Sequence, residues 1–441
     1  MKLFYILILF IFFQSCSFDN KSGIWKNKNI TNDKNDDLFK DFENLASADG
    51  SFNKIISIKN DFKFKLTNPI NNLEWKEIFY NQSNNFDNFQ YNNSNQLIFK
   101  SKKLSKFDIQ DFILFEDNNA ITSDKKGNII IFSVNQNKII SKFNFYKKKY
   151  KKITKHLNII VQNNVIYVTD NIGFMYAFDY KENKILWAKK NKVPFSSNLK
   201  ISGNKLIAAN QNNYLYFINI NNGDILSLIP TEETTIKNEF KNNISSNKNV
   251  SLFLNTYGSL YAIENKNMKI KWFLNLNQSI DINPSNLFLG NQILINDRVV
   301  VLSSNQFTYV IDINNGSIIH RLNLSTSIKP IINNSYIFAI TKNSLLVGVD
   351  LNTGKIIYSY RITEKLAEFL KIKEGEIEFK NIMLVNNKIF IFLKNSFLLK
   401  FNINGELEAV NKLSSKLNTH PIFIDKSMLY LDKKNRLSII D

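Results

Sequence analysis

The sequence predicts an all-β protein built as a single eight-bladed β-propeller of four-stranded antiparallel blades. Three observations predict this fold: a hairpin motif that recurs along the chain, a second motif between its copies, and a last copy of the hairpin that stops halfway. One blade cannot bury both of its faces, so neighbouring blades have to stack and the ring has to close.

The recurring hairpin is clearest in residues 173–187, 258–272 and 344–358. Each copy has alternating apolar residues, then an acidic or amide residue, a polar turn and a second alternating run, which is the pattern of a β-hairpin. We call the residue at this acidic or amide position the marker, and we expect an Asp, Asn or Ser there to cap the tight turn with its side chain. The markers, at a spacing of roughly 38 to 52 residues that suits one blade each, are Ser133, Asp179, Asn219, Glu264, Asp312, Asp350, Asn402 and Asp441. Eight markers predict eight blades.

The second motif consists of two apolar runs joined by a short turn that contains Asn or Gly. It occurs in residues 158–169, 199–209, 330–340 and 381–391. We expect these segments to form the two inner strands of a blade, and the marker hairpins to form the two outer strands.

The C-terminal copy ends at its marker, Asp441, so the last blade lacks its outermost strand. The N-terminal part of the chain is the natural donor of this strand. Good copies carry an aromatic residue eight positions after the marker, namely Trp187, Trp272 and Tyr358. Residues 71–79 fit that strand, and we expect Trp75 to take the aromatic position and to lie beside Ile439.

The first residues predict export. A cationic start is followed by the apolar run from Leu3 to Phe13, which is shorter than the roughly 20 residues of a membrane span and suits a signal peptide. Cys16, the only cysteine of the chain, lies where a lipoprotein signal has its acylated cysteine, and Ser15 fits that resemblance while Phe13 and Gln14 depart from it. The alternative is an ordinary cleavage site with an unmodified Cys16. We expect a signal peptide over residues 1–15, a lipid-anchored flexible tether over 16–55 and the propeller over 56–441.

The formal net charge of the chain is +19, and lysines cluster in residues 147–152. Such a cluster is able to meet anionic lipid headgroups or nucleic acid. Lys, Asn and Ile are enriched along the whole chain, however, so we favour a compositional bias without a function. We expect no nucleic acid partner for an exported protein.

The phrase Gly-x-Leu-Tyr-Ala-Ile/Phe-Asp/Glu followed by Lys-Ile-x-Trp resembles the repeat of pyrroloquinoline-quinone-type propellers. It is seen in residues 173–187 and 258–272. With a lipoprotein-type signal and eight repeats, the mature chain is similar to the BamB family of the β-barrel assembly machinery. The copies around Ser133, Asn219 and Asn402 lack the Trp and part of the Gly pattern, so the chain resembles a divergent member.

The resemblance implies a non-catalytic scaffold, lipid-anchored on the periplasmic face of the outer membrane. It implies binding to the periplasmic domains of the barrel-inserting outer-membrane subunit. The family's partner-binding loop corresponds to residues 231–240, where Ile236 and Lys237 stand in for a Leu-Arg pair, and a second family feature corresponds to Asp281 and Asn283. That both segments are plain inter-blade loops stays open as the alternative.

The enzyme that competes with the scaffold is a quinone-dependent dehydrogenase. Such an enzyme needs a carboxylate base beside the quinone, oxygen ligands for Ca²⁺ and commonly a pair of neighbouring cysteines, and the chain lacks that pair. His156, His320 and His420 lie in different repeats without metal-ligand spacing. We therefore expect no enzyme, no cofactor and no metal. A periplasmic propeller that binds a small ligand or a polysaccharide in its channel is the third possibility.

Overall fold

The computed structural model describes residues 16–18, 25–27, 52–233, 242–276, 290 and 292–441. The chain divides into two compact units, Met1–Gly50 and Ser51–Asp441. In the first unit, β1 (Cys16–Phe18) pairs with β2 (Trp25–Asn27) in an antiparallel ladder. Among the described residues, no helix combines the length and the apolar character needed to cross a membrane.

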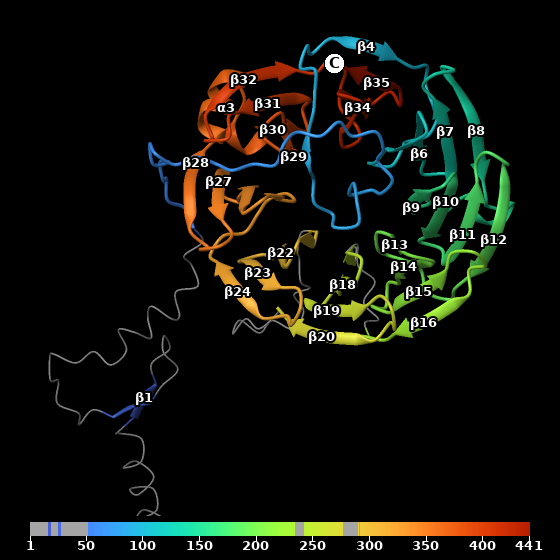
Figure 1. Cartoon of the computed structure of the whole chain (residues 1–441), viewed down its shortest axis with the longest axis horizontal. Helices are drawn as coiled ribbons and strands as arrows, with labels where there is room; N and C mark the ends of the chain where they lie inside the picture. The colour runs from blue at the N-terminus through green and yellow to red at the C-terminus, as the bar shows by residue number, and fades with distance from the viewer. Residues whose placement is uncertain (1–15, 19–24, 28–51, 234–241, 277–289, 291) are drawn as a thin grey trace, which may run out of the picture. The chain divides into compact units, whose positions relative to one another are not determined.

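The second unit is a ring of eight antiparallel blades around a central channel, as predicted (Figure 1). From the innermost strand outward, the first four blades are β5 (Leu114–Glu116), β6 (Asn119–Ser123), β7 (Asn128–Ser133) and β8 (Lys138–Asn144); β9 (Leu157–Gln162), β10 (Val165–Asp170), β11 (Phe174–Asp179) and β12 (Lys184–Lys190); β13 (Lys200–Ser202), β14 (Lys205–Ala209), β15 (Leu215–Asn219) and β16 (Ile225–Ile229); β17 (Asn243–Ser246), β18 (Val250–Leu254), β19 (Ser259–Glu264) and β20 (Ile270–Asn275). The last four are β21 (Leu294–Asn296), β22 (Val299–Ser303), β23 (Thr308–Asp312) and β24 (Ile318–Leu322); β25 (Ile331–Asn333), β26 (Tyr336–Ile340), β27 (Leu345–Asp350) and β28 (Ile356–Arg361); β29 (Phe379–Val385), β30 (Lys388–Leu393), β31 (Phe397–Phe401) and β32 (Leu407–Lys412); β33 (Ile422–Ile424), β34 (Ser427–Leu431), β35 (Leu437–Ile440) and β4 (Leu97–Lys100).

Burial explains why the middle strands have nearly continuous apolar sequences. In β14 and β30 every residue but the first is buried, because a neighbouring blade covers each face of the sheet. The outermost strands are largely exposed and keep more polar residues; in β20 four of the six residues are exposed and the other two are partly buried. The two predicted motifs therefore form the inner and the outer pair of strands, as expected.

Five of the Asp and Asn markers cap the turn that follows them, as predicted. Asp179 Oδ1 accepts hydrogen bonds from the main-chain N–H groups of Lys181 and Glu182, both at 2.9 Å. The same bond to the N–H group two residues on forms at Asn219, Asp312, Asp350 and Asn402. Short polar side chains are suited to this role because they reach their own turn.

In two blades, the tryptophan eight residues after the marker locks the blade to the next one. Trp187 Nε1 donates to the main-chain oxygen of Ile220 at 2.7 Å, and the Trp187 ring lies directly on Gly223 in the turn of the following blade. Trp272 does the same with Ile313 and Gly316. A Cβ atom at Gly223 would lie 2.4 Å from the indole ring, so only glycine fits there.

The N-terminal part of the chain completes blade 8, but the predicted strand was wrong. The strand that pairs with β35 is β4, with Phe99 opposite Ile439. Phe99 takes the aromatic position, and its ring centroid lies 6.1 Å from that of Phe132 in blade 1. Trp75 instead lies inside the ring, 2% exposed, and forms an isolated bridge with Phe115 of β5.

The reason is that residues 71–79 match the apolar pattern of the strand but not its surroundings. An outermost strand has to tolerate solvent on one side, and Leu97 and Ile98 of β4 are 40% and 55% exposed. Glu77, two residues after Trp75, is instead buried against Lys200 of blade 3. This ion pair ties the segment to blade 3 inside the channel.

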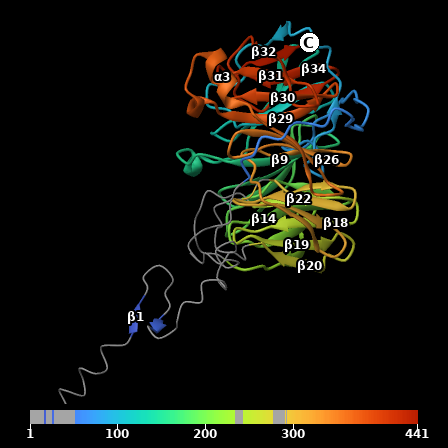
Figure 2. The same ribbon diagram turned by 90° about the vertical axis from the view of Figure 1, so that its left-hand side faces the viewer.

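The helices in the described part of the chain lie in connections between blades. The 3₁₀ helix η1 (Lys148–Tyr150) follows β8, and helix α3 (Thr363–Leu370) and η2 (Glu374–Glu376) follow β28. Each connection runs from the outermost strand of one blade to the innermost strand of the next, so all leave the ring on one face, which we call the connection face. Figure 2 shows η1, in teal, and α3 on the same side of the ring.

We expect Gly223→Ala to be far more destabilising than Gly203→Ala. Both glycines have a positive φ, which costs an alanine about 1–2 kcal/mol. The new methyl group meets nothing within 4 Å at Gly203 but overlaps the Trp187 ring at Gly223, which adds roughly 1–3 kcal/mol.

Urea unfolding of the two variants measures the difference. In a Trp187→Ala background the two glycine substitutions should cost nearly the same. Equal costs in the wild-type background would contradict the inter-blade lock.

Candidate functional site

Residues 70–92 cross the central channel and form what we call the plug, the blue segment inside the ring in Figure 1. The plug contacts the inner strand of every blade. Trp75 exchanges two main-chain hydrogen bonds of 2.8 Å with Phe115 of blade 1, and Lys76 accepts one from Val161 of blade 2. In blade 7 the short strand β3 (Asn88–Phe89) adds to β29 in parallel.

Amide side chains make most of the other contacts of the plug. Asn85 is the clearest case, since it donates to the main-chain oxygen of Ile332 at 2.8 Å and accepts from its N–H at 3.0 Å. An amide pairs in this way as a further strand would. Side-chain amides also donate hydrogen bonds to main-chain oxygens of the remaining blades: Gln82 to Ile201, Asn84 to Ile244 and Ile293, and Asn72 to Phe423.

The plug therefore satisfies the inner edges of the sheets. Without a partner, the innermost strands would present unpaired N–H and C=O groups to the channel. The contacts fall at the ends of these strands, at Ser246 in β17 and Val385 in β29, for example. The plug lies at the channel end where the inner strands finish, away from the connection face.

Aromatic rings fill the space inside the plug. The Trp75 ring lies 4.6 Å from Tyr80 and 5.6 Å from both Phe86 and Phe89, measured between centroids. Phe89 is fully buried, and Tyr80 donates its hydroxyl to Asp87 at 2.7 Å. The plug is thus a small core of its own.

Two lysines of the ring are buried beneath the plug. Lys200 forms an ion pair with Glu77 and donates to Asn81 O at 2.7 Å. Lys329 Nζ donates to Asn84 O at 2.6 Å and lies 3.1 Å from the centre of the Phe86 ring. Burial lowers the pKa of both lysines and raises that of Glu77.

The plugged section of the channel does not fit a quinone. The rings of Trp75 and Phe89 fill it, and both are buried within the protein. The acids of the plug are all engaged, since Glu74 pairs with Lys76, Glu77 with Lys200, and Asp87 with Tyr80. None is a free carboxylate base, and Asp179 and the other markers lie at the outer hairpins.

The histidines lie apart, as the sequence indicates. His420 Nε2 is 3.3 Å from Asp111 Oδ2 at the surface, and His320 packs on Gly354 in the next blade. Among the described residues, no three His, Cys, Asp or Glu side chains are grouped to hold a metal ion.

The predicted partner-binding residues Ile236, Lys237, Asp281 and Asn283 lie outside the described residues. Cys16 lies in β1, where only the main chain is described. The positions named for partner binding belong to the connections after β16 and after β20, and the connection after β16 is described up to residue 233.

The start of that connection is firmly attached to blade 4 through Glu232. Its carboxylate accepts hydrogen bonds from Ser259 at 2.7 Å, Tyr261 at 2.8 Å and Asn255 at 2.5 Å. Burial raises the pKa of Glu232, but these donors outweigh it and lower the pKa overall. The connection therefore leaves the ring from a fixed point.

The closed ring, its marker turns and its tryptophan locks define the chain as an eight-bladed propeller of the pyrroloquinoline-quinone-type repeat. The family model described as outer membrane protein assembly factor BamB matches residues 125–360, more than half of the chain. The chain belongs to this family. No curated protein sequence matches the chain.

Solved structures share the fold at low sequence identity. BamB from Moraxella catarrhalis is similar with a TM-score of 0.60 and 13% identity, over 78% of this chain and 99% of that one. The quinohemoprotein alcohol dehydrogenase from Comamonas testosteroni has a TM-score of 0.59 and 11% identity, over 83% and 80%. The computationally designed Ika8 protein has 0.56 and 10%, over 77% and 99%. Such likenesses show the fold alone.

The plug was not predicted from the sequence, although the sequence contains a signal for it. Residues 80–96 are rich in Asn and Gln and still carry four aromatic residues, Tyr80, Phe86, Phe89 and Tyr91. All four rings are buried. Amides between aromatic residues indicate a segment that is enclosed yet has many main-chain groups to satisfy.

We expect Lys200→Met to lower the free energy of unfolding by about 3–5 kcal/mol, because it leaves the buried Glu77 without its partner. Lys200→Met combined with Glu77→Leu should recover most of the loss, since an apolar pair of similar volume needs no desolvation. Chemical unfolding at pH 8 measures both variants.

Lys189→Met is the matched control, because Lys189 pairs with Asp224 at 2.8 Å on the surface. It should cost at most about 1 kcal/mol. If the double variant were as unstable as Lys200→Met alone, the buried pair would not be the cause.

We expect Lys400→Met to flatten the rise of stability with pH. Lys400 on β31 donates to Asn95 at 2.9 Å just after the plug, and burial lowers its pKa to about 8. Between about pH 8 and the ordinary lysine pKa near 10.4, the unfolded chain holds a proton that the folded chain lacks. Stability gained through this group therefore grows as pH rises and is lost as pH falls toward 8.

Unfolding curves between pH 7.5 and 9.5 test this expectation. The slope of the free energy of unfolding against pH should be smaller in Lys400→Met by up to about 1.4 kcal/mol per pH unit. The exposed Lys394→Met should keep the wild-type slope. Equal slopes in all three proteins would contradict the shifted pKa.

Proposed function

We propose that the protein is a non-catalytic scaffold lipoprotein of the β-barrel assembly machinery. It binds the periplasmic domains of the barrel-inserting outer-membrane subunit and so helps the assembly and insertion of β-barrel proteins into the outer membrane. It acts on the periplasmic face of that membrane and uses no cofactor. The membership of the chain in the BamB family supports this role.

The plug is the single observation that carries the proposal. Enzymes on propeller folds work at the channel, and here the chain's own residues 70–92 occupy one end of it and pair with all eight inner strands. Buried rings and paired acids leave no reactive group there. What such a ring offers to a partner is its outer surface and its connections.

The connection face is the surface we assign to the partner. Ile236 and Lys237 follow the attachment point at Glu232, and Asp281 and Asn283 lie in the next connection between blades. An apolar residue beside a cation suits an interface, where a few central residues carry most of the binding energy. These four residues are proposed contacts with the barrel-inserting subunit.

The anchor belongs to the same proposal. Removal of residues 1–15 as a signal peptide leaves Cys16 at the new N-terminus, where a lipid attaches it to the membrane. Residues 16–55 then form the tether that links the lipid to the propeller of residues 56–441.

We expect a tagged copy of the protein to recover the barrel-inserting subunit from detergent-solubilised membranes. A variant with Ile236→Ala and Lys237→Glu should recover on the order of tenfold less, because it removes the central contacts of the interface. Lys355→Glu, an equal charge change on an exposed hairpin of blade 6, should leave recovery unchanged. Quantitative immunoblotting of the eluates measures the ratio.

Consistent failure of the wild-type protein to recover that subunit would contradict the scaffold role. Alcohol-dependent dye reduction after addition of quinone and Ca²⁺ would instead show that the protein is a quinone-dependent dehydrogenase. Lipid labelling that persists in the Cys16→Ser variant would refute lipid attachment at Cys16 but would leave the proposed partner binding unaffected.

A further inference from the structure

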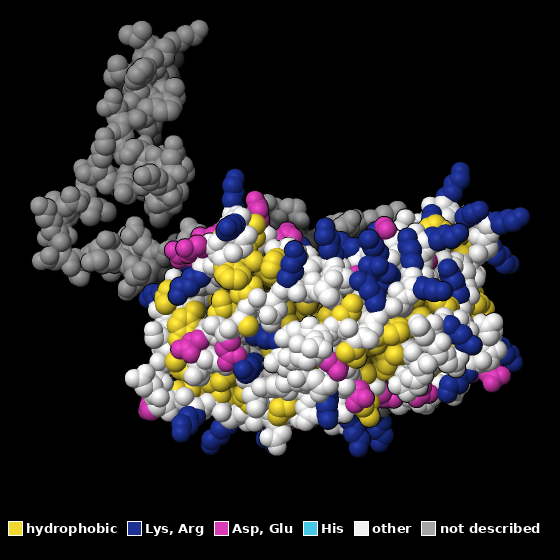
Figure 3. All heavy atoms as spheres, turned by 90° about the horizontal axis from the view of Figure 1, so that it is seen from above, with side chains coloured by type: hydrophobic (Ala, Val, Ile, Leu, Met, Phe, Trp, Pro, Cys, Tyr) yellow, Lys and Arg dark blue, Asp and Glu magenta, His cyan; other side chains and the backbone are white. Residues whose placement is uncertain are grey.

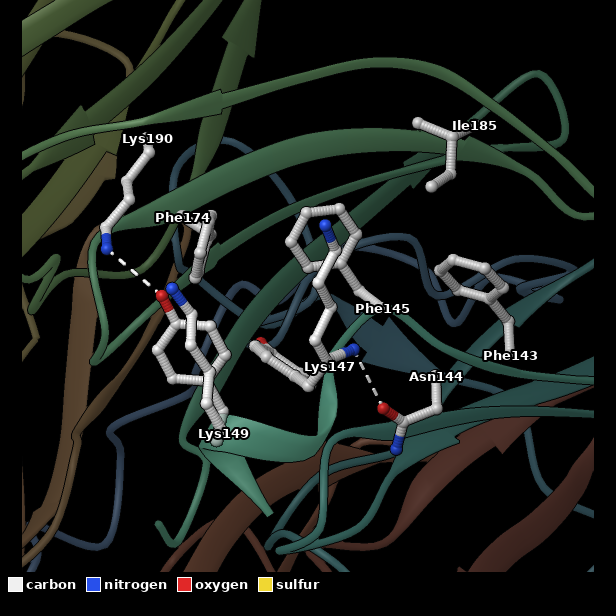
Figure 4. A pocket seen from close by; sticks show the side chains of 10 residues that line it. Phe143, Asn144, Phe145, Lys147, Lys149, Phe174, Ile185 and Lys190 are labelled. Atoms are coloured by element: carbon white, nitrogen blue, oxygen red, sulfur yellow. Dashed lines mark hydrogen bonds between the residues drawn. The ribbon is translucent and has the colours of Figure 1, made fainter.

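A hollow of about 520 Å³ with an aromatic wall opens between the outer strands of blades 1 and 2 (Figure 4). Its apolar lining includes Phe145 after β8, Phe174 at the start of β11 and Ile185 in β12. Phe145 stacks on Tyr176 of the core at 4.5 Å, and Phe174 meets Phe145 edge-on at 5.1 Å. We call this hollow the Lys-aromatic basin, after these rings and the lysines at its rim.

Three lysines, Lys147, Lys149 and Lys190, line the rim of the basin. Lys190 Nζ donates to the Tyr150 hydroxyl at 3.2 Å, and Lys149 Nζ lies 4.9 Å from the centre of the Tyr150 ring. Figure 4 shows both ammonium groups next to that hydroxyl. The hydrogen bond from Lys190 and the nearby charge of Lys149 lower the pKa of Tyr150.

The positive charge of the basin is not balanced by acids. None of its lining residues is Asp or Glu, and residues 125–169 contain 10 lysines and no acidic residue at all. Within the described part of the chain, the three rim lysines join no ion pair, whereas the nearby Lys189 pairs with Asp224. Figure 3 shows Lys and Arg side chains gathered at the upper right, on the side of the ring where β7 and β8 lie in Figure 1.

The segment that carries the rim is held rigidly from below. The Tyr146 hydroxyl donates to the buried Asp170 at 2.5 Å, and the Tyr146 ring packs where Gly127 has no side chain. The buried Lys155 donates to the main-chain oxygen of Tyr150. The basin is therefore formed in the protein before any ligand binds.

We propose that the Lys-aromatic basin binds the phosphate of an anionic phospholipid at a membrane surface, an inference that rests on the proposed membrane location. The phosphate lies between Lys149, Lys190 and the Tyr150 hydroxyl, and the apolar part of the lipid next to it contacts the aromatic wall. Ile153, 44% exposed directly after the lysine cluster, enters the interface beside the basin. Apolar side chains flanked by lysines are typical of such surfaces.

The observations favour lipid over nucleic acid. Bases bind along a groove by stacking on exposed ring faces, and Phe145 already uses a face against Tyr176 inside the protein. The basin is a single hollow that suits one headgroup. Its position on η1 also places it on the connection face, so lipid binding would orient the connections to the membrane.

We expect the mature chain, residues 16–441 with Cys16→Ser, to sediment with vesicles of phosphatidylcholine that contain 30 mol% phosphatidylglycerol but not with pure phosphatidylcholine. The variant Lys147→Gln, Lys149→Gln and Lys190→Gln should bind on the order of 100-fold more weakly, since each lysine near an anionic surface contributes severalfold. Lys266→Gln, Lys269→Gln and Lys271→Gln, an equal loss of charge at exposed sites of blade 4, should bind like the parent. Ile153→Ser should weaken binding severalfold, because it removes an apolar contact at constant charge.

Each outcome decides the proposal. Equal weakening by both triple variants would overturn it, because net charge alone would then explain binding. Complete displacement by inorganic phosphate, or tighter binding to a single-stranded oligonucleotide than to vesicles, would overturn the lipid as the ligand. The assay contains neither the barrel-inserting subunit nor a lipid anchor, so failure of the scaffold role leaves its result unaffected.

Discussion

The ring depends on one N-terminal stretch, residues 70–100, which completes it both at its outer edge and in its central channel. On the outside, β4 supplies the missing strand of blade 8, with Phe99 opposite Ile439. On the inside, the plug supplies the partner that eight inner strands lack. The locks between blades, such as Trp187 on Gly223, act only between neighbours. Within the part of the chain that the structure describes, residues 70–100 contact all eight blades, so the stability of the ring as a whole depends on them.

The repeat made most of the fold predictable from the sequence. Alternating apolar residues, capped turns and aromatic positions are local signals. Each recurs in several copies of the repeat, so that a copy that lacks one signal can still be recognised by the others. The inner and outer strands, the marker turns and the open last blade all follow from them. The choice of Trp75 for closure failed because two segments, around Trp75 and around Phe99, carry an aromatic residue in an apolar stretch. The burial of Glu77 against Lys200 distinguishes the segment around Trp75, and this contact joins residues far apart in the chain.

The candidate sites were less predictable for a physical reason. The plug uses amides that satisfy main-chain groups of other blades, and such pairs leave no periodic pattern. The lysine cluster at residues 147–152 was visible in the sequence, but its meaning depends on which acids and rings surround it. The structure places aromatic rings beneath these lysines and no acid beside them. Lys189, the residue next to Lys190, has by contrast an acidic partner, Asp224.

The position of the closing residues at the start of the chain has a consequence for biogenesis. Phe99 is synthesised long before Ile439, its partner 340 residues later. At roughly 5–20 residues per second, the early segment waits about 20–70 s for the end of the chain to appear. The ring stays open in that time, because β4 cannot pair with β35 before β35 exists. A chain that is cut short anywhere before β35 therefore never forms the closed ring. Its exposed strand edges are recognised by chaperones and proteases.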